Sequence, residues 1–265
     1  MIFNIGGGAN AKSQMPDFTY TGRYQVINDS KVNGVQNWRI KLLSDGDLKF
    51  NRVVPNIDVF LVGGGGGGAS GGGGGGGGYT RTSSVTVERG RVYSVTIGDG
   101  GSAGLTPDGQ ENGGDGQTTR AFGLSASGGK GGIHQEGMTG TYGGAGGSGG
   151  GGFGGGNGGT NGSNGGQARS GYPGGNGQGR STREFGSNSG TLYAGGGGGG
   201  NYSEWSYVGG QGGAGGGGDG HQSQFENGHN GSANTGGGGG GGLKQATGTN
   251  GGKGGSGIVV IRNAR

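Results

Sequence analysis

Histidines and aspartates are the side chains of this sequence that could carry acid–base or metal chemistry. His134, His221 and His229 all lie in stretches rich in glycine, asparagine and glutamine, and no His-x₃-His spacing occurs. We therefore expect all three to be solvated loop histidines. The aspartates in Gly-rich turns could bind calcium, but they lack the nonapeptide register of calcium-binding repeats, so turn formation is the favoured role. They are Asp99, Asp108, Asp115 and Asp219.

Aromatic and arginine side chains offer a recognition chemistry instead. Many aromatics lie after residue 98, in segments rich in Ser, Gly and Asn, which is the composition of binding loops. Arginines in the same region supply planar donors for carboxylate, phosphate or sugar groups. We assign Phe122 and Phe153 to covering the sides of the fold. The predicted receptor-binding residues are Tyr142, Tyr172, Arg180, Arg183, Phe185, Tyr193, Tyr202, Trp205, Tyr207 and Phe225.

Enzymatic and nucleic-acid functions find little support. The chain has no cysteine, which removes thiolate catalysis, disulfides and Cys-based metal sites. Matches to GxGxxG follow trivially from glycine abundance, and no GxxxxGK[ST] occurs. The net charge is +4, but the basic residues are scattered and form neither RGG repeats nor a basic stripe. We expect a non-enzymatic protein without cofactor, metal, nucleic-acid partner, membrane insertion or export signal.

Glycine distribution divides the chain into two kinds of structure. Of 265 residues 89 are glycine, and hydrophobic residues make up 25%, which excludes a conventional core of matching size. Residues 1–62 hold six glycines, whereas residues 98–257 hold 68. We expect an N-terminal attachment segment at 1–17, a β scaffold at 18–97 completed by a strand at 257–263, and a glycine-rich bundle with exposed loops at 98–256.

The scaffold segments have the composition of β-strands. Short runs rich in β-branched and aromatic residues alternate with turn signals such as Ser44–Asp45–Gly46. The continuous apolar run 257–262 is typical of a central strand. We predict a small antiparallel β-sandwich from strands at 23–29, 37–43, 47–51, 56–63, 79–90, 91–97 and 257–262.

The glycine-rich part shows a period of three. Uninterrupted glycine runs, such as Gly71–Gly78 and Gly236–Gly242, are flanked by GGx repeats. Three residues per turn is the period of the polyproline II helix, whose backbone N–H and C=O groups all point outward. Without Cβ atoms, such helices can pack closely and bond to one another, with side chains at solvent-facing positions. We predict a bundle of polyglycine II helices; a flexible Gly/Ser linker is the alternative.

The edges of the glycine-rich region resemble a known family. The segments IDVFLVGGGGGG, GGGGGGGGYTRTSSVTVERGRVYSVTIGDGG and GGKGGSGIVVIR, spread over residues 57–265, resemble the glycine-rich domain of phage and prophage tail proteins. The chain is also similar to the polyglycine-helix tip adhesins of phage long tail fibres, and more distantly to the glycine-rich ectodomain of the anaplastic lymphoma kinase receptor family. The resemblance to the phage adhesins implies loops between glycine helices that contact a host surface receptor.

Two functions from different classes follow. The first is a receptor-binding adhesin at a phage tail or fibre tip, which recognises a host surface protein or glycan through its loops. It would contact other tail proteins through the N-terminal region, as a homotrimer or as the cap of a trimeric fibre. It would assemble in the bacterial cytoplasm and reside in the virion. The alternative is a structural virion or surface component with the glycine bundle as a rigid spacer.

Overall fold

The protein is an all-β molecule with a glycine-rich extension, described here from a computed structural model. The structure describes residues 15–28, 37–54, 56–105, 111–134, 142–167, 172–202, 208–244 and 249–263. Within these ranges helical structure is limited to one short 3₁₀ turn, η1 (Glu184–Gly186), and none is long and apolar enough to cross a bilayer. The strands are β1 (Phe18–Tyr20), β2 (Tyr24–Asn28), β3 (Trp38–Leu42), β4 (Gly46–Phe50), β5 (Ile57–Val62), β6 (Thr80–Val85), β7 (Val92–Val95), β8 (Thr119–Ala121), β9 (Leu124–Ala126) and β10 (Ile258–Asn263).

Two antiparallel sheets form one end of the molecule. The larger has the order β2-β3-β10-β5-β6 and the smaller β1-β4-β7. Alternate residues of β3, such as Ile40 and Leu42, are buried, as expected for a strand with one face on a core. They share one hydrophobic cluster with Leu48 and Phe50 of β4, so the two sheets enclose a common core. The prediction of a central strand near the C-terminus is confirmed, since β10 lies between β3 and β5.

A third sheet consists of the two strands β8 and β9. These strands were not predicted from the sequence. The chain reverses at Phe122 and Gly123, which both have positive φ, as a two-residue turn of the primed type requires. The Phe122 ring packs on Tyr93 with centroids 5.0 Å apart. Phe122 therefore extends the hydrophobic cluster of the sheets and does not cover the sides of the glycine-rich part, which corrects the expectation.

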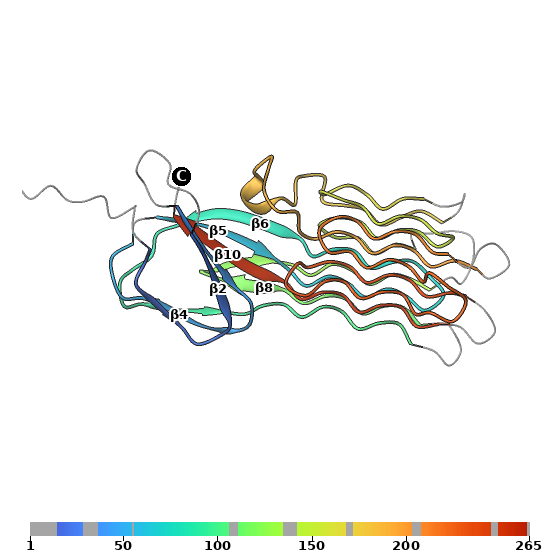
Figure 1. The fold of residues 1–265 in the computed structure, drawn as a ribbon, viewed down its shortest axis with the longest axis horizontal. Helices are drawn as coiled ribbons and strands as arrows, with labels where there is room; N and C mark the ends of the chain where they lie inside the picture. Colours follow the sequence, from blue (N-terminus) through green and yellow to red (C-terminus); the bar gives the residue numbers. More distant parts are fainter. Residues whose placement is uncertain are drawn as a thin grey trace, which may run out of the picture.

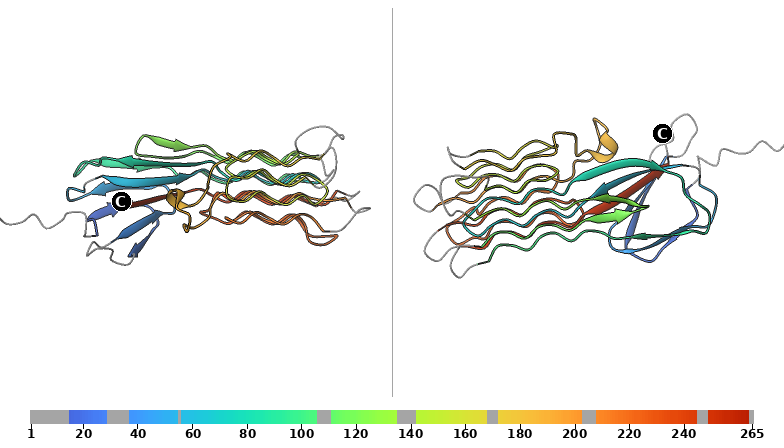
Figure 2. Two further views of the ribbon diagram at one scale, coloured as in Figure 1. Left: turned by 90° about the horizontal axis from the view of Figure 1, so that it is seen from above. Right: turned by 180° about the vertical axis from the view of Figure 1, so that it is seen from behind.

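Extended glycine-rich segments, here called threads, make up the rest of the molecule. They run side by side along its long axis, away from the sheets (Figure 1). Two further views show them stacked in several layers (Figure 2). The segment 63–79 belongs to this bundle, although it lies between β5 and β6 in the sequence and within the predicted scaffold range.

Backbone hydrogen bonds hold the threads together with a period of three residues. In thread 63–69, successive N–H groups donate to three different neighbours, and the carbonyl groups accept from three others. Gly64 and Gly67 donate to Gln117 and Gly114 of one neighbour. Gly65 and Gly68 donate to Gly255 and Gly252 of a second, and Gly66 and Ala69 to Gly76 and Gly73 of a third, all at 2.8–3.0 Å. The accepted bonds come from Gly101 and Gly104, Gly129 and Gly132, and Gly239 and Gly242.

Threads with neighbours on every side are built around runs of glycine, with other residues only at their ends. Like 63–69, the threads 73–79, 148–153, 194–200 and 236–242 each bond to neighbours all around them, and we call these the interior threads. They contain the uninterrupted glycine runs, apart from Gly215–Gly218, which follows the turn at Ala214. A Cβ at Gly65 would overlap the carbonyl oxygen of Gly237, and similar overlaps occur along every interior thread. Close backbone approach therefore requires glycine at these positions.

The strands set the register of the threads. Val62 faces Thr80 in the β5–β6 pair, and the same antiparallel register continues as Gly63 donates to Tyr79 and Gly66 to Gly76. The β5–β10 pair continues in the same way into the bonds of thread 63–69 with residues 252–255. The sheets thus define where each of these threads begins.

Candidate recognition surface

The predicted receptor-binding residues do not form one cluster in the described parts of the chain. Trp205 and Tyr207 lie outside the described residues. The remaining eight divide into an aromatic cluster, a group beside the sheets, and Phe225.

Tyr142, Tyr172 and Phe153 form a buried aromatic cluster, against which Tyr202 packs. The ring centroids of Tyr142 and Tyr172 are 5.2 Å apart, and those of Phe153 and Tyr172 are 5.5 Å apart. Tyr142 is 4% exposed and Tyr172 is 3% exposed, so their rings have almost no surface for a partner. Tyr202 is half-buried. The cluster packs the bundle internally, and for Phe153 this agrees with the structural role we had assigned.

Arg180, Arg183, Phe185 and Tyr193 lie beside the larger sheet, away from Tyr202. Phe185 and Tyr193 pack on Phe60 of β5 in a second small hydrophobic cluster. Both arginines are engaged by backbone carbonyls: Arg180 Nη2 donates to Thr80 at 2.9 Å and Arg183 Nη1 to Gly190 at 3.0 Å. This segment, 179–193, therefore fastens the bundle to the outer face of the sheet.

One ion pair and one cation–π contact reinforce that attachment. Arg39 Nη1 of β3 lies 2.6 Å from Glu184 Oε1, and Glu184 is only 3% exposed. Tyr193 donates its hydroxyl hydrogen to Glu184 Oε2 at 3.1 Å; burial, with the Glu184 charge adding to it, raises the pKa of this phenol. The Arg262 guanidinium lies 3.9 Å from the centroid of the Phe185 ring and pairs with Asp58.

The histidines differ from the prediction of three solvated side chains. His229 is half-buried, but His134 and His221 are buried, and His134 Nδ1 lies 3.1 Å from the Ser70 carbonyl oxygen. Both ring nitrogens of His221 lack a hydrogen-bond partner among the described residues. Desolvation by burial lowers the pKa of His221 to about 4, so the ring is neutral at pH 7.

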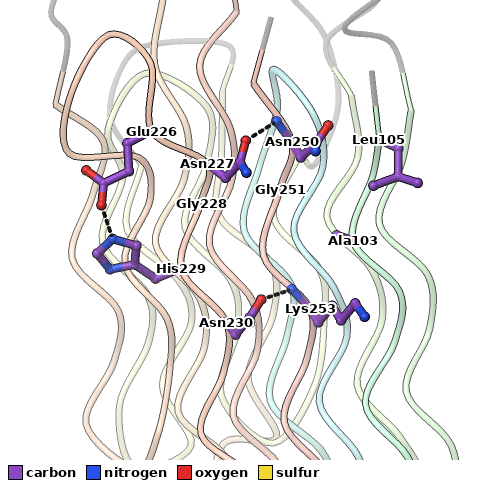
Figure 3. Close-up of a pocket in the computed structure, with 10 residues that line it drawn as sticks. All are labelled: Ala103, Leu105, Glu226, Asn227, Gly228, His229, Asn230, Asn250, Gly251 and Lys253. Carbon is purple, nitrogen blue, oxygen red and sulfur yellow. Dashed lines mark hydrogen bonds and ion pairs between the residues drawn. The ribbon is translucent and has the colours of Figure 1, made fainter. Parts of the chain in front are cut away.

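Phe225 is the predicted residue that the structure leaves most open, at 81% exposed. It precedes Glu226 at one end of an open groove of about 520 Å³ on the side of the bundle. Figure 3 shows this groove, with Glu226, Asn227, His229 and Asn230 on one side and Ala103 and Leu105 on the other. Asn250, Gly251 and Lys253 line it between these two sides (Figure 3).

Side-chain amides line the groove in a regular arrangement. Asn227 Oδ1 accepts the Asn250 N–H at 2.9 Å, and Asn230 Oδ1 accepts the Lys253 N–H at 2.8 Å (Figure 3). The spacing of three residues on both threads matches the period of the backbone bonds. Asn227, Asn230 and Lys253 are exposed, and Leu105 adds an apolar side chain that is about half exposed.

An acid–base pair stands at the end of the groove. His229 Nε2 lies 2.8 Å from Glu226 Oε1, and His229 Nδ1 lies 3.8 Å from Asp219 Oδ2. The hydrogen bond from His229 lowers the pKa of Glu226. In the described residues no group of three or more His, Cys, Asp or Glu side chains could hold a metal ion. The groove therefore offers hydrogen bonds and a small apolar rim, which suit binding.

Two of the aspartates considered for calcium or turns, Asp115 and Asp219, accept backbone N–H groups. Asp115 Oδ1 accepts the Gly131 N–H, and its other oxygen pairs with Lys130 Nζ at 2.6 Å. Asp219 Oδ1 accepts the Gly212 N–H at 2.7 Å. These carboxylates satisfy outward-pointing amides at the edge of the bundle, as Asn227 and Asn230 do. Asp108 lies outside the described residues.

Comparison with protein-family models places the chain in a family. A family model described as a glycine-rich domain covers residues 44–264, which is most of the chain. The chain belongs to this glycine-rich domain family. No curated protein matches the sequence.

In this glycine-rich domain the amide-lined groove is the feature that sequence reasoning missed. Asn227 and Asn230 lie three residues apart, one position from the glycines that pack inward, and this spacing is visible in the sequence. Their partners, Asn250 and Lys253, show the same spacing. Nothing in the sequence indicates that these two segments are neighbours, because that depends on the order in which the threads pack.

Proposed function

We propose that this chain is a receptor-binding adhesin at the tip of a phage tail or tail fibre. In this proposal the two sheets form a β-sandwich, the threads are polyglycine II helices, and the protein recognises a bacterial surface through loops and side chains of the bundle. The first 17 residues attach it to other tail proteins, in a homotrimer or as the cap of a trimeric fibre.

The three-residue recurrence of the backbone bonds supports the helix assignment. A β-strand bonds to two neighbours in one plane, whereas an extended helix with three residues per turn directs its groups in three directions. Thread 63–69 donates along three directions and accepts along three. The hydrophobic cluster shared by β3, β4, β5, β7 and β10 supports the sandwich.

The division of the molecule into two ends is the observation that carries the adhesin proposal. β10 ends at the sheet end, where Asn263 pairs with Ile57 of β5, and β1 lies in the smaller sheet. The threads extend away from the sheets and turn back at the opposite end (Figure 1). A molecule anchored at its sheets would therefore present the far turns of the bundle to a surface. The resemblance to phage tip adhesins suggests that the surface contacted is a bacterial envelope.

Replacement of loop residues tests the proposal. In one variant a Gly-Ser segment of equal length replaces residues 203–207, and in a second it replaces residues 222–226. Adsorption of virions carrying the full-length variants is measured on a panel of bacterial strains, together with particle yield. Changed strain range with normal yield supports the adhesin. Unchanged adsorption by both variants contradicts it.

A rigid structural spacer is the second candidate, favoured by a separate observation. Every interior thread is bonded on all sides, and a Cβ at most of its glycines would overlap neighbouring backbone. The bundle is therefore stiff whether or not its surface binds a partner. This function predicts the opposite result in the same experiment. Particle yield would fall when the bundle is disrupted by Gly238→Ala, while adsorption would not respond to the loop replacements.

A further inference from the structure

We propose that the groove lined by Asn227, Asn230, Lys253 and Leu105 binds a hydroxyl-rich glycan chain. The inference rests on the proposed function, since it names the ligand class of the adhesin, but it places the contact on the side of the bundle. Asn227 and Asn230 lie in the Phe225 segment, 221–235, whose composition the sequence indicated for binding, whereas Lys253 and Leu105 lie outside it.

The orientation of both amide groups is fixed by the backbone they contact. A peptide N–H can only donate, so the Oδ1 atoms of Asn227 and Asn230 must face the N–H groups of Asn250 and Lys253. Each Nδ2 group, with two donor hydrogens, then points away from that bond. Neither Nδ2 has another partner in the described part of the chain, and both residues are exposed.

These donors form a row along the groove. Three residues of extended chain separate Asn227 from Asn230, which places the two amides roughly 9 Å apart. The Lys253 ammonium group, exposed and without an ion-pair partner among the described residues, adds a further donor in the groove, where its side chain extends away from Asn230 (Figure 3). Because their scaffold is a bonded backbone, the amides lose little freedom when a ligand binds.

The row of donors favours an acceptor-rich polymer. Sugar hydroxyl oxygens accept hydrogen bonds, and their hydrogens can be donated to the Glu226 carboxylate, which also lines the groove. On the other side, Ala103 and Leu105 offer apolar atoms to the C–H face of a pyranose ring. The groove is open to solvent, which suits a chain passing along it better than an enclosed small molecule.

Asparagine-to-aspartate substitutions isolate the donors. In N227D/N230D the carboxylate oxygens still accept the Asn250 and Lys253 N–H groups, while the Nδ2 donors are lost. The matched control is N157D/N164D: Asn157 and Asn164 are exposed and accept the N–H groups of Gln211 and Gly177, both at 2.9 Å, outside the groove. Full-length proteins are applied to an array of bacterial lipopolysaccharides and capsular polysaccharides, and hits are titrated by calorimetry.

We expect the wild-type protein and the control to bind the same array glycans, and N227D/N230D to bind them at least ~10-fold more weakly, as loss of two hydrogen bonds implies. Melting temperatures of the two double variants serve as the check on folding. Equal affinity of N227D/N230D and the control, or no binding of wild-type protein to any array glycan, overturns the proposal. If virions still adsorb through the loops in either case, the adhesin function stands and only the groove assignment fails.

Discussion

Gly65 donates its amide hydrogen to the carbonyl oxygen of Gly255 at 2.9 Å, in the register that pairs Val62 with Ile258 in the adjoining sheet. Two segments far apart in the sequence thus meet first as strands and then as glycine threads without a shift. The sheets have an extended hydrophobic core, whereas these two threads are joined by backbone bonds, so the sheet supplies the long-range pairing and the threads continue it. Four predictions follow from this arrangement and from the contacts around it.

Alanine at an interior glycine should be strongly destabilising. The Cβ of Gly238→Ala would overlap the Gly75 carbonyl oxygen, and the interior thread has no space into which to shift. We expect a loss of about 3 kcal/mol or more in the free energy of unfolding, measured by urea denaturation. In the control Gly166→Ala the added Cβ lies 3.1 Å from the Asn157 nitrogen at a half-exposed position, and the loss should stay below about 1 kcal/mol. Equal stability of the two variants would show that the interior packing is wrong.

Amide hydrogen exchange should be slowest in the interior threads. The N–H groups of residues 195–200 and 238–242 bond to neighbouring threads at 2.8–3.2 Å, and these threads are enclosed by others. Their exchange should approach the rate set by global unfolding. Mass spectrometry with gas-phase fragmentation can resolve these glycines. Exchange within seconds in either thread would instead identify the region as a flexible linker.

Acid should destabilise the protein through His221. The pKa of His221 is lowered from 6.5 to about 4, so between these values the unfolded chain binds a proton that the folded chain does not. The contribution of neutral His221 to the free energy of unfolding is therefore complete above pH 6.5. It decreases as the pH falls toward 4 and does not decrease further below that pH. The total loss is roughly 3 kcal/mol. Thermal melts of wild type, His221→Gln and the control His229→Gln between pH 4 and 7.5 should show a flatter profile for His221→Gln alone; parallel profiles for all three would contradict it.

The Glu184 carboxylate should stabilise the contact between the bundle and the sheet. In Glu184→Gln, Tyr193 keeps a hydrogen-bond acceptor, but Arg39 loses its charged partner. We expect a loss of about 2 kcal/mol in urea denaturation, because Glu184 is buried. The exposed Glu88–Arg91 pair is the control, and Glu88→Gln should change stability by less than about 0.5 kcal/mol. A similar small effect of both substitutions would mean that the buried pair has no special role.

Local sequence patterns predicted the strands of the two larger sheets except β1, and extended β6 five residues beyond its end at Val85. The β-branched and apolar residues of β5 and β10 identify buried strands, and their bounds differ from the predicted ranges by one residue at each end or less. Glycine runs likewise pointed to threads without room for side chains. The β8–β9 hairpin was not predicted, because its turn contains Phe122 and Phe is rarely found at a position that requires positive φ.

The roles of the aromatic and arginine side chains could not be predicted in the same way. Phe185 and Tyr193 have the sequence context of a binding loop, but they pack against Phe60, which is distant in the sequence. Whether a side chain is buried depends on which residues the fold places next to it. The composition of its own segment does not reveal those neighbours. The same holds for Asn230, whose role depends on the adjacent thread that contains Lys253.

The parallel course of the threads also determines how the molecule would respond to a mechanical load. A pull between the far turns of the bundle and the sheets is directed along the threads, nearly at right angles to the bonds that join them. Sliding thread 63–69 past its neighbours would require its bonds to Gly76, Gly114, Gly252 and their equivalents to break together. Tension along this axis is therefore shared among many bonds in shear, whereas a sideways force could separate the outermost threads one bond at a time.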